Sequence, residues 1–400
     1  MMDKMGLDRE YEGPIEVISK YNEPNPSSTS QVKDFLLSKG WKPKIFKDGA
    51  NGKVPQLRDD NKNLCESVVK LIEEFPELEA LQGLSVAQHR AGYLKAFLDT
   101  RDEDNCVTAS WTGIAKTFRV KHSKPIVNLP SNNSQYGELV RACLIAPKGK
   151  VFANADMSSL EDKTKQIAIY NYDPEYVETL NTPGYDAHLN IALLGGFMDQ
   201  DDVDFYKWYN KTKGEGEGCP DKYKYSDKSA EFKRLSKLRK SSKLTNYSAT
   251  YGASAKKIAE SADISLKDAE KLKDAYWNLN WSVKKYAEDL TVKNVRGKNF
   301  IWNPYTKLWL VLTSDHIKFS ACNQNLGSCV FDLFLYFLIQ DGIMPISTIH
   351  DELSFYINEG EEEITKEKVK KAIDKVNKAY DFPIKFESEP EFATSYGGLH

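Results

Sequence analysis

The feature that most limits the fold of this chain is the stretch from Arg239 to Gly252, RKSSKLTNYSATYG. If this stretch is helical, Arg239, Lys243, Tyr247 and Tyr251 are spaced four residues apart and lie on one face. A face that begins with two cations and continues into two aromatic rings is typical neither of a solvated helix nor of a buried one. It suits a ligand with a polyphosphate at one end and a flat base at the other, such as a nucleoside triphosphate.

The length of the chain, 400 residues, allows more than one domain around a sizeable core. A hydrophobic content of 40% and an aromatic content of 12% indicate an ordered globular protein. The net charge of −3 gives no overall argument for a nucleic-acid partner. The charge is unevenly distributed, however, because residues 222–243 include nine Lys and Arg residues and only two acids.

The cysteines and the apolar stretches indicate a cytoplasmic protein that does not enter a membrane. The six cysteines follow no disulfide or zinc spacing, which fits a reducing compartment. The first ten residues are charged and lack the apolar core of a signal peptide. The longest apolar stretch, Cys329 to Ile339, is too short to span a bilayer and contains Asp332, so we expect a buried helix there.

Two acids follow predicted strands. Val151 to Asp156 is expected to be a short strand, after which Ser158 and Glu161 have the spacing of a capping box at the start of a helix. Strands over 344–349 and 353–357 are expected to form a hairpin whose turn contains Asp351. Carboxylates at such rigid positions can share a pair of Mg²⁺ ions for phosphoryl transfer. Each acid taken singly fits a turn or cap better than a metal site, and the pair indicates metal binding only beside the cation-and-ring face of the 239–252 helix.

The remaining pattern is mixed. Residues 25–28, NPSS, are expected to begin a helix, and 207–228 is expected to be a flexible insertion whose role, in binding DNA, binding protein or as a solvated loop, stays open. Other helices are expected at 64–74, 81–98, 266–279, 283–292 and 315–339, and strands within 299–312 and 382–386.

Three segments together resemble a known family. Residues 156–161 (DMSSLE), the Arg239 to Gly252 helix and residues 350–352 (HDE) resemble motifs A, B and C of the family A DNA polymerases, the polymerase I group, in the same order. Further segments are similar to its phage replicative branch, so that the resemblance covers nearly the whole chain. These segments are 25–28 with 40–41, 136–141, 186–188, Asn323 and the terminal His400.

The resemblance implies an α+β chain with the right-hand polymerase fold, made of an antiparallel-sheet palm, mostly helical fingers and a truncated thumb. The expected boundaries are 1–100 for the thumb base and lead-in helices, 101–162 for the first part of the palm with motif A, 163–340 for the fingers, and 341–400 for the second part of the palm with the motif C hairpin. Motif B is expected as a helix over 237–252.

The resemblance also implies roles for individual residues. Asp156 and Asp351 would bind two Mg²⁺ ions, Glu352 is a third candidate metal ligand, and Lys243 would be a catalytic residue near the leaving pyrophosphate. The residues implied in binding the incoming deoxynucleotide are Arg239, Lys243, Tyr247, Tyr251, Glu161 and His188. The residues implied in contacting DNA are Arg141, Asn323, His350 and Gly252.

Several of these roles have an alternative. Glu161, which by resemblance packs with Tyr251 and excludes a ribose 2′-hydroxyl, also fits the capping box. Glu352 and His350 fit ordinary turn residues, and Arg141 fits a structural salt bridge. All of these alternatives stay open from the sequence alone.

The sequence also departs from the family pattern. The family's Arg after motif A is Lys163, its Thr-Gly-Arg ends in Ile114, and its Gln after Asn323 is Gly327. The last two positions would probe the minor groove of the primer–template, so reduced fidelity is a hypothesis, with Lys116, Arg119 or Asn325 as candidate substitutes. Few residues precede the 25–28 segment, so neither an exonuclease domain nor a full thumb is expected.

The resulting prediction is a template-directed DNA polymerase of phage type without its own proofreading exonuclease, located in the host cytoplasm. Its expected partners are primer–template DNA, dNTPs and, if the polymerase is split, a second polypeptide or a processivity factor. Two alternatives stay open: a nucleic-acid-binding half that depends on a partner's active site, and a single-subunit RNA polymerase. The sugar gate that the resemblance implies at Glu161 argues against the RNA polymerase.

Overall fold

The structure is a computed structural model that describes residues 23–26, 28–49, 52–58, 64–108, 110–123 and 125–399. The expectations for Ser27 and His400 lie outside these residues. The chain divides into two compact units at Gln88 and His89. Among the described residues, no helix is both long and apolar enough to cross a membrane.

The first unit is a small helical body with its own core. Ser28 caps its first helix by accepting a hydrogen bond from the backbone N–H of Gln31 (3.4 Å), as the NPSS segment predicts. Its elements are α1 (Thr29–Ser38), β1 (Phe46–Gly49), β2 (Gly52–Pro55), α2 (Glu66–Glu74), the 3₁₀ turn η2 (Pro76–Glu79) and the first turns of α3 (Ala80–Thr100). Its buried core consists of Leu36, Trp41, Cys65, Val68, Leu71 and Leu78.

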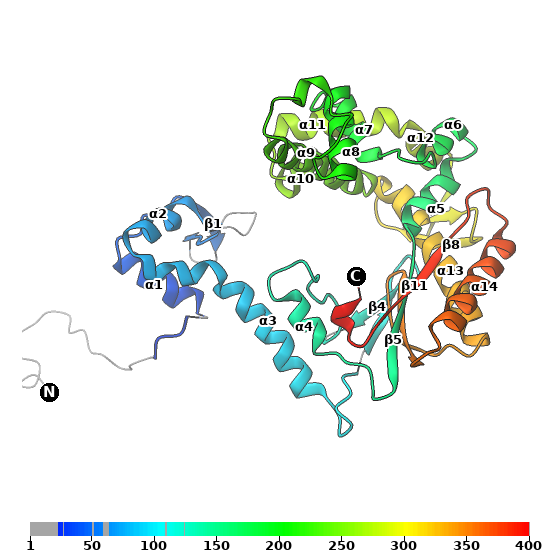
Figure 1. Ribbon diagram of the computed structural model, residues 1–400, viewed down its shortest axis with the longest axis horizontal. Coiled ribbons are helices and arrows are strands. Elements are labelled where there is room, and N and C mark those ends of the chain that lie inside the picture. The colour runs from blue at the N-terminus through cyan, green and yellow to red at the C-terminus, as the bar shows by residue number, and fades with distance from the viewer. Residues whose placement is uncertain are drawn as a thin grey trace, which may run out of the picture. The chain divides into compact units, whose positions relative to one another are not determined.

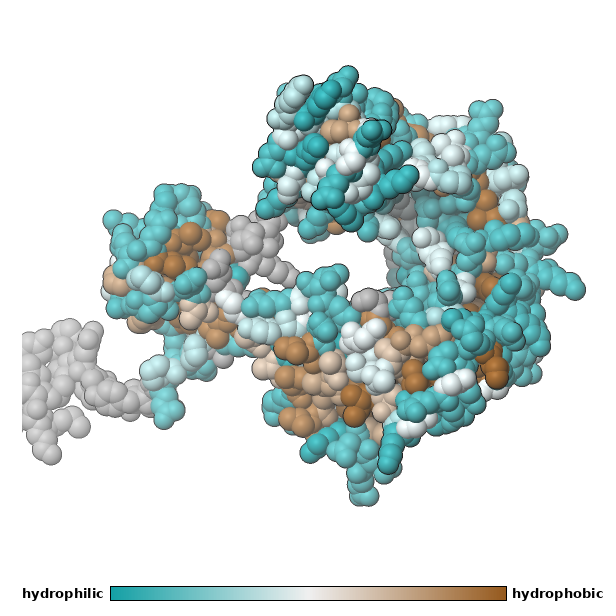
Figure 2. Space-filling model, viewed as in Figure 1, coloured by the Kyte–Doolittle hydropathy of each residue, from teal (hydrophilic) through white to brown (hydrophobic). Residues whose placement is uncertain are grey.

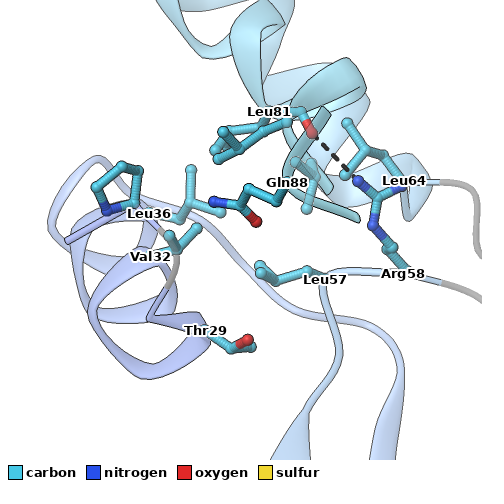
Figure 3. A pocket seen from close by; sticks show the side chains of 11 residues that line it. Thr29, Val32, Leu36, Leu57, Arg58, Leu64, Leu81 and Gln88 are labelled. Atoms are coloured by element: carbon cyan, nitrogen blue, oxygen red, sulfur yellow. Dashed lines mark hydrogen bonds between the residues drawn. The ribbon is translucent and has the colours of Figure 1, made fainter. Parts of the chain in front are cut away.

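A cavity of about 110 Å³ lies beside this core (Figure 3). Val32 and Leu36 of α1 line it together with Leu57, while Arg58 donates a hydrogen bond to the carbonyl of Leu81 across one side (3.1 Å). The lining is predominantly aliphatic and carries no group suited to catalysis. This cavity is therefore a feature of packing rather than a candidate active site.

The second unit begins with the remainder of α3 and is an α+β body. Its strands are β3 (Ser110–Ile114), β4 (Val120–Ser123), β5 (Lys150–Met157), β6 (Val292–Val295), β7 (Lys298–Asn303), β8 (Leu308–Leu312), β9 (Pro345–Ile349), β10 (Glu352–Asn358) and β11 (Ser388–Ala393). Its α-helices are α4 (Gly137–Ala142), α5 (Leu160–Ile169), α6 (Pro174–Leu180), α7 (Ala187–Leu194), α8 (Gln200–Thr212), α9 (Lys228–Thr250), α10 (Ala255–Ala262), α11 (Leu266–Leu279), α12 (Trp281–Asp289), α13 (Lys318–Gln340) and α14 (Glu362–Tyr380). Short 3₁₀ turns are η3 (Asp221–Tyr223), η4 (Asp315–Ile317) and η5 (Tyr396–Gly398).

A four-stranded antiparallel sheet with the order β11-β5-β10-β9 forms the base of this unit. Side chains alternate across a strand, so Ala153, Ala155 and Met157 of β5 point into a core that α13 and α14 complete. Figure 1 shows these two helices next to β5 and β11. The opposite face of the sheet carries Asp156, and Phe152 on that face packs with Tyr396 and Leu399.

The helices α6 to α12 gather at the other end of the unit (Figure 1). One buried cluster joins α7, α8 and α9, and a second joins α7, α9, α10 and α11. Between the helices and the large sheet, β6, β7 and β8 form a three-stranded antiparallel sheet. The helix α13 joins two cores, because Phe319 packs in a cluster with α5, α6 and α12 and Phe334 packs under the large sheet.

Several sequence predictions need correction. The capping box at Ser158 and Glu161 is not formed, because Ser159 is the N-cap residue and its side chain accepts no hydrogen bond from the helix. Residues 207–212 continue α8 rather than forming a flexible insertion, and Lys222 ties the following loop to Asp199 and Asp202 of α8 (2.6 and 2.5 Å).

The strand expected over 382–386 is also wrong, since the final strand is β11. The aromatic rings that suggested a strand belong to an irregular segment, in which Phe382 stacks on Tyr380 (5.0 Å between ring centroids). The side-chain amide of Asn377 satisfies both the backbone N–H (2.8 Å) and the carbonyl (2.9 Å) of Phe386, so the segment needs no strand partner there.

Candidate functional site

Three carboxylates lie in one row across the face of the large sheet opposite α13 and α14. Asp156 of β5 is in register with Glu352 of β10 on one side and with Glu389 of β11 on the other. Residues directly opposite each other on antiparallel strands point to the same face. Because the neighbouring Ala155 and Met157 are buried in the core, this row faces away from α13 and α14.

The turn between β9 and β10 brings Asp351 to the end of the same row. The backbone N–H of Met157 donates a hydrogen bond to the carbonyl of Asp351 (3.0 Å), so the turn is bonded to the end of β5. His350 in this turn has a φ of 61°, a left-handed conformation that is costly for a residue other than glycine. Strand pairing on both sides holds the turn in this shape, and the two predicted acids, Asp156 and Asp351, are brought together.

Tyr396 links the acid row to Arg141. Its hydroxyl donates a hydrogen bond to a carboxylate oxygen of Glu352 (2.7 Å), and the guanidinium of Arg141 lies over its ring, 4.9 Å from the centroid. Burial, and then the nearby Glu352 carboxylate, raise the pKa of Tyr396, so the hydroxyl remains a donor at neutral pH. Arg141 also donates to the carbonyl of Pro130 (2.9 Å), which gives it a structural role.

The helix α9 carries the stripe of cations and rings predicted from the sequence. Asp227 caps the start of the helix by accepting hydrogen bonds from the backbone N–H groups of Ser229 and Ala230 (both 3.1 Å). The helix begins at Lys228, nine residues before the expected start at 237. The helix ends at Thr250, and Gly252 just after it has a φ of 76° and a missing Cβ that would lie 3.0 Å from the carbonyl oxygen of His316. Glycine is required at this end both by conformation and by space.

The first cation of the stripe is held by an acid. Arg239 donates to Asp186 (2.7 Å), and Asp186 also caps α7 by accepting the backbone N–H groups of His188 (2.9 Å) and Leu189 (3.1 Å). Burial alone would raise the pKa of Asp186, but the hydrogen bond from Arg239 keeps it below its ordinary value. The guanidinium is therefore fixed in place at the start of α7.

His188 lies between this pair and the aromatic part of the stripe. A ring nitrogen lies 3.2 Å from the side-chain amide of Asn246, and the ring centroid lies 6.0 Å from that of Tyr247. Burial, together with the positive charges of Arg239 and Lys243, lowers the pKa of His188 to about 4 in spite of Asp186. The imidazole is neutral at neutral pH.

Lys243 is the cation with an available charge. Its ammonium group lies 5.9 Å from the centroid of the Tyr247 ring. Within the described residues, no carboxylate lies within ion-pair distance of it. An anionic ligand at this point would meet an uncompensated positive charge.

Glu161 is fixed at both its backbone and its side chain. Its carboxylate forms an ion pair with Arg119 (2.6 Å), and its carbonyl accepts a hydrogen bond from the side-chain amide of Asn323 (3.0 Å). Both charged side chains are mostly buried, with 21% of Arg119 and 28% of Glu161 exposed. Glu161 therefore presents a positioned, neutralised carboxylate rather than a helix cap.

A cavity of about 430 Å³ brings some of these groups together, although Asp156, Arg239 and Lys243 are not among the described residues that line it. Figure 2 shows that hydrophilic residues predominate on the surface of the helical part of this unit in this view. The cavity is lined by Arg119, Ser159, Leu160, Glu161, Asp162, Ala187, His188, Asn246, Tyr247, His350 and Asp351. The structure thus joins the motif A, B and C segments at one cavity.

Some predicted residues lie outside this lining. In the described part of the chain, Tyr247 lines the cavity but Tyr251 does not, and Glu161 contacts Arg119 where packing with Tyr251 was expected. Gly252 serves the end of α9, and Asn323 is occupied by the backbone of Glu161.

The acid row fits a hard divalent cation. Among the described residues, no group of three His, Cys, Asp or Glu side chains converges into a complete metal centre. Mg²⁺ usually takes only one or two carboxylates and completes its shell with water and substrate phosphates. Asp156 and Asp351 supply two carboxylates, and Glu352 accepts a hydrogen bond from Tyr396.

The sequence alone did not single out Glu389, Tyr396 or Asn246. The alternation of Glu387, Glu389 and Glu391 is a strand signal that could have identified Glu389 as facing the same way as a neighbouring acid. No sequence signal identifies Tyr396 as the partner of Glu352, because the contact depends on the order of strands in the sheet.

Comparisons with known proteins give a distant relative and a shared fold. None of the available family models matches the chain. A DNA polymerase of Mycobacterium phage L5 is 26% identical over 294 residues, which are 71% of this chain and 41% of the relative. The chain therefore spans less than half the length of this curated relative.

A solved structure shares the fold. It is the POL domain of Pol1 from M. smegmatis in complex with DNA primer–template and dNTP, with a TM-score of 0.61 and 17% identity. The match covers 94% of this chain and 61% of that chain. At this identity the likeness establishes the α+β polymerase-domain fold and not the chemistry.

Proposed function

We propose that this chain is a template-directed DNA polymerase that adds deoxynucleoside triphosphates to a primer 3′ end. The observation that carries the proposal is the meeting of Asp156 and Asp351 at the end of β5, beside a cavity lined by α9. Two carboxylates on rigid backbone, next to fixed cations and an aromatic ring, suit phosphoryl transfer to a nucleotide. The distant similarity to a phage DNA polymerase supports the same function.

In this proposal the large sheet is the palm and the helices from α5 to α12 belong to the fingers. Asp156 and Asp351, with Glu352 beside them, would hold Mg²⁺, which when bound would lower the pKa of the primer hydroxyl and neutralise phosphate charge. The primer–template would lie against the palm near Asn323, His350 and Arg141. The proposed partners, DNA and dNTP, are those named for the solved Pol1 domain.

The chain's own residues would hold the nucleotide by charge and shape. Lys243, whose charge is uncompensated, would bind the triphosphate and stabilise the leaving pyrophosphate. Arg239 is kept in position by Asp186 and would supply a second phosphate contact. The neutral His188 would donate or accept a hydrogen bond there without adding charge.

Sugar and base would be bound at the other end of the cavity. Tyr247, 52% exposed, offers a ring face to the sugar or base. Glu161, held by Arg119 and Asn323, would close the space that a ribose 2′-hydroxyl needs. The enzyme would therefore prefer deoxynucleotides.

Primer extension by the full chain tests the proposal. With Mg²⁺ and dNTPs we expect extension of a labelled primer directed by the template, and little extension with NTPs. Asp156→Asn should lower the extension rate by at least about 1,000-fold, because a metal-binding carboxylate supplies several kcal/mol of transition-state stabilisation.

Asp274→Asn on the exposed side of α11 is the matched control, because it removes an equal charge outside the site. It should extend primers as the wild type does. Equal activity in Asp156→Asn and wild type, or extension with NTPs alone, would contradict the proposal.

A further inference from the structure

The helix α9 extends well beyond the candidate cavity. It has 23 residues, and those of its described residues that line the cavity, Asn246 and Tyr247, lie near its end. The first half of the helix is held by other contacts, because Phe232 stacks on Tyr209 of α8 (4.3 Å between ring centroids) and Leu235 is 0% exposed between α7, α8 and α9. The backbone of this half is therefore fixed, although its described residues do not line the cavity.

One exposed face of α9 leads along the helix to the cavity. Lys233, Lys240 and Tyr247 are seven residues apart, which is close to two helical turns, so their side chains lie in line on the same face. Lys237 and Lys243 fall between them at spacings of three and four residues. All four lysines are exposed, as is Tyr247. The face thus runs from the supported first half of α9 to the ring of Tyr247 at the cavity.

The charge of this face is positive and is not balanced within the helix. Residues 232–252 contain six cations and no Asp or Glu. The two arginines are paired with acids from outside this range, Arg234 with Glu231 (2.8 Å) and Arg239 with Asp186 (2.7 Å). The four lysines have no ion pair among the described residues. The exposed face therefore carries a row of uncompensated positive charges.

The length of this row matters for an anion in solution. From Lys233 to Lys243 the helix rises by about 15 Å, at about 1.5 Å per residue. The range over which salt of about 0.1 M screens a charge is about 10 Å, so Lys233 extends the positive field beyond the reach of Lys243. A row of like charges that leads to a site raises the local concentration of an oppositely charged ligand and its association rate. A nucleoside triphosphate is such a ligand.

The same row could also attract a longer polyanion, such as a single DNA strand. Proteins that hold a single strand usually place aromatic rings among the cations, and the bases stack on these rings. Residues 233–243 contain no aromatic residue. The first ring on this face is Tyr247, which already belongs to the cavity. Charge without rings favours a transient attraction toward the cavity over a separate binding site for a strand.

We propose that Lys233, Lys237 and Lys240 form an electrostatic guide that draws nucleoside triphosphates along α9 to the cavity and speeds their association. This inference rests on the proposed function, in which Lys243 binds the triphosphate. The guide acts on the encounter and not on the bound nucleotide. It gives a function to the part of α9 that precedes the expected start at 237.

Stopped-flow fluorescence measures this association directly. Full-length chain, bound to primer–template DNA with a 3′-dideoxy end that prevents reaction, is mixed with a fluorescent dATP analogue and Mg²⁺. In salt of about 0.01 M, Lys233→Gln combined with Lys237→Gln should lower the association rate constant by about 5-fold and the dissociation rate constant by less than about 2-fold, because charges outside a site act mainly on association. The difference should vanish in salt of about 1 M, where the screening length is about 3 Å.

Lys267→Gln combined with Lys271→Gln on α11 is the matched control, because these lysines are also exposed, four residues apart and without an ion pair among the described residues. This variant should associate with the nucleotide as fast as the wild type. Lys233→Arg combined with Lys237→Arg should also keep the wild-type rate, since it keeps both charges. Far-ultraviolet circular dichroism of each variant verifies that the chain is folded.

The inference is wrong if the folded glutamine variant of Lys233 and Lys237 associates as fast as the wild type in low salt, if its loss persists in high salt, or if the α11 control loses as much. It is also wrong if the glutamine variant weakens binding of the primer–template itself by a similar factor, measured by fluorescence anisotropy, because the row would then bind DNA. Failure of the proposed function has a different signature. In that case the wild type extends no primer, while the salt-dependent association of the nucleotide can still be measured.

Discussion

Arg119 and Glu161 show how one ion pair can set the shape of the candidate site. The pair joins the β3–β4 hairpin to α5 at 2.6 Å, and both side chains line the cavity. A charge-assisted hydrogen bond of this kind fixes a carboxylate in one rotamer, at a strength of about 1.5–3 kcal/mol. Without Arg119, the carboxylate can turn toward water and leave the space that it fills.

We therefore predict that Arg119→Met lowers the preference for dNTP over NTP by about 10-fold, since about 1.4 kcal/mol of discrimination corresponds to that factor. The measurement is the ratio of kcat/KM for single dNTP and NTP incorporation. Lys298→Met, which removes an exposed cation on β7, should leave the ratio unchanged. An unchanged ratio in Arg119→Met would show that Glu161 keeps its position without the ion pair.

His188 gives a pH-dependent contribution to stability. Its pKa is lowered from 6.5 to about 4 in the folded chain, mainly by burial. Between these two values the unfolded chain binds a proton that the folded chain does not, so falling pH favours unfolding. The contribution is fully present above about pH 6.5 and is lost as pH falls toward about 4.

We predict that His188→Asn flattens the dependence of the unfolding free energy on pH between these limits. Urea denaturation of wild type and variant at a series of pH values measures the difference, which should grow in favour of the variant as pH falls. A difference that stays constant with pH would contradict the burial of a neutral His188.

At the scale of elements, the end of α9 depends on Gly252. Its φ of 76° favours glycine, and an added Cβ would meet the carbonyl oxygen of His316 at 3.0 Å. Gly297, between β6 and β7, has a nearly equal φ of 77° but nothing within 4 Å of an added Cβ. Alanine substitutions at the two positions therefore distinguish the cost of the left-handed conformation from the cost of steric conflict.

We predict that Gly297→Ala destabilises the chain by about 1 kcal/mol, the usual cost of a left-handed alanine, and that Gly252→Ala costs more because His316 must also move. Unfolding free energies from urea titration give both values. Equal losses of unfolding free energy would mean that the backbone at His316 moves away from the added methyl group at no cost.

The elements themselves were predictable where a local signal existed. The four-residue spacing of Arg239, Lys243 and Tyr247 correctly predicted a helix, and the acid at 156 followed a real strand. The N-cap at Asp227 was not predicted, and the final strand was predicted at 382–386 and not at β11. In the 382–386 segment, Phe382 and Phe386 fit a strand pattern locally, but in the folded chain Phe382 stacks on Tyr380 and the backbone of Phe386 is hydrogen-bonded to Asn377.

At the scale of the whole molecule, the site is assembled from segments far apart in the sequence. The acids at 156 and 351 could be proposed from their strand ends, but their meeting depends on the sheet order β11-β5-β10-β9. The same order places Glu389 beside Asp156 and Tyr396 against Glu352. No local pattern carries such information, so only the resemblance of three ordered motifs joined these segments in advance.

The two units have separate cores of very different size. The first contains a single small cluster around Leu36, Trp41 and Val68, and the second is built on several larger clusters. A unit of so few residues buries little apolar surface and is expected to be only marginally stable. Each core should therefore melt in its own transition, the first unit at the lower temperature.

Val68 of α2 and Val330 of α13 form a matched pair for this prediction, since both are helical and 0% exposed. Val→Ala at either site should cost about 2 kcal/mol in lost burial and cavity formation. By differential scanning calorimetry, Val68→Ala should lower only the first transition, by about 10 °C, because a small unit has a small unfolding entropy. Val330→Ala should lower only the second transition, and by less, because the same free energy is divided by the larger unfolding entropy of the second unit. A single transition that both variants shift would mean that the two cores unfold as one.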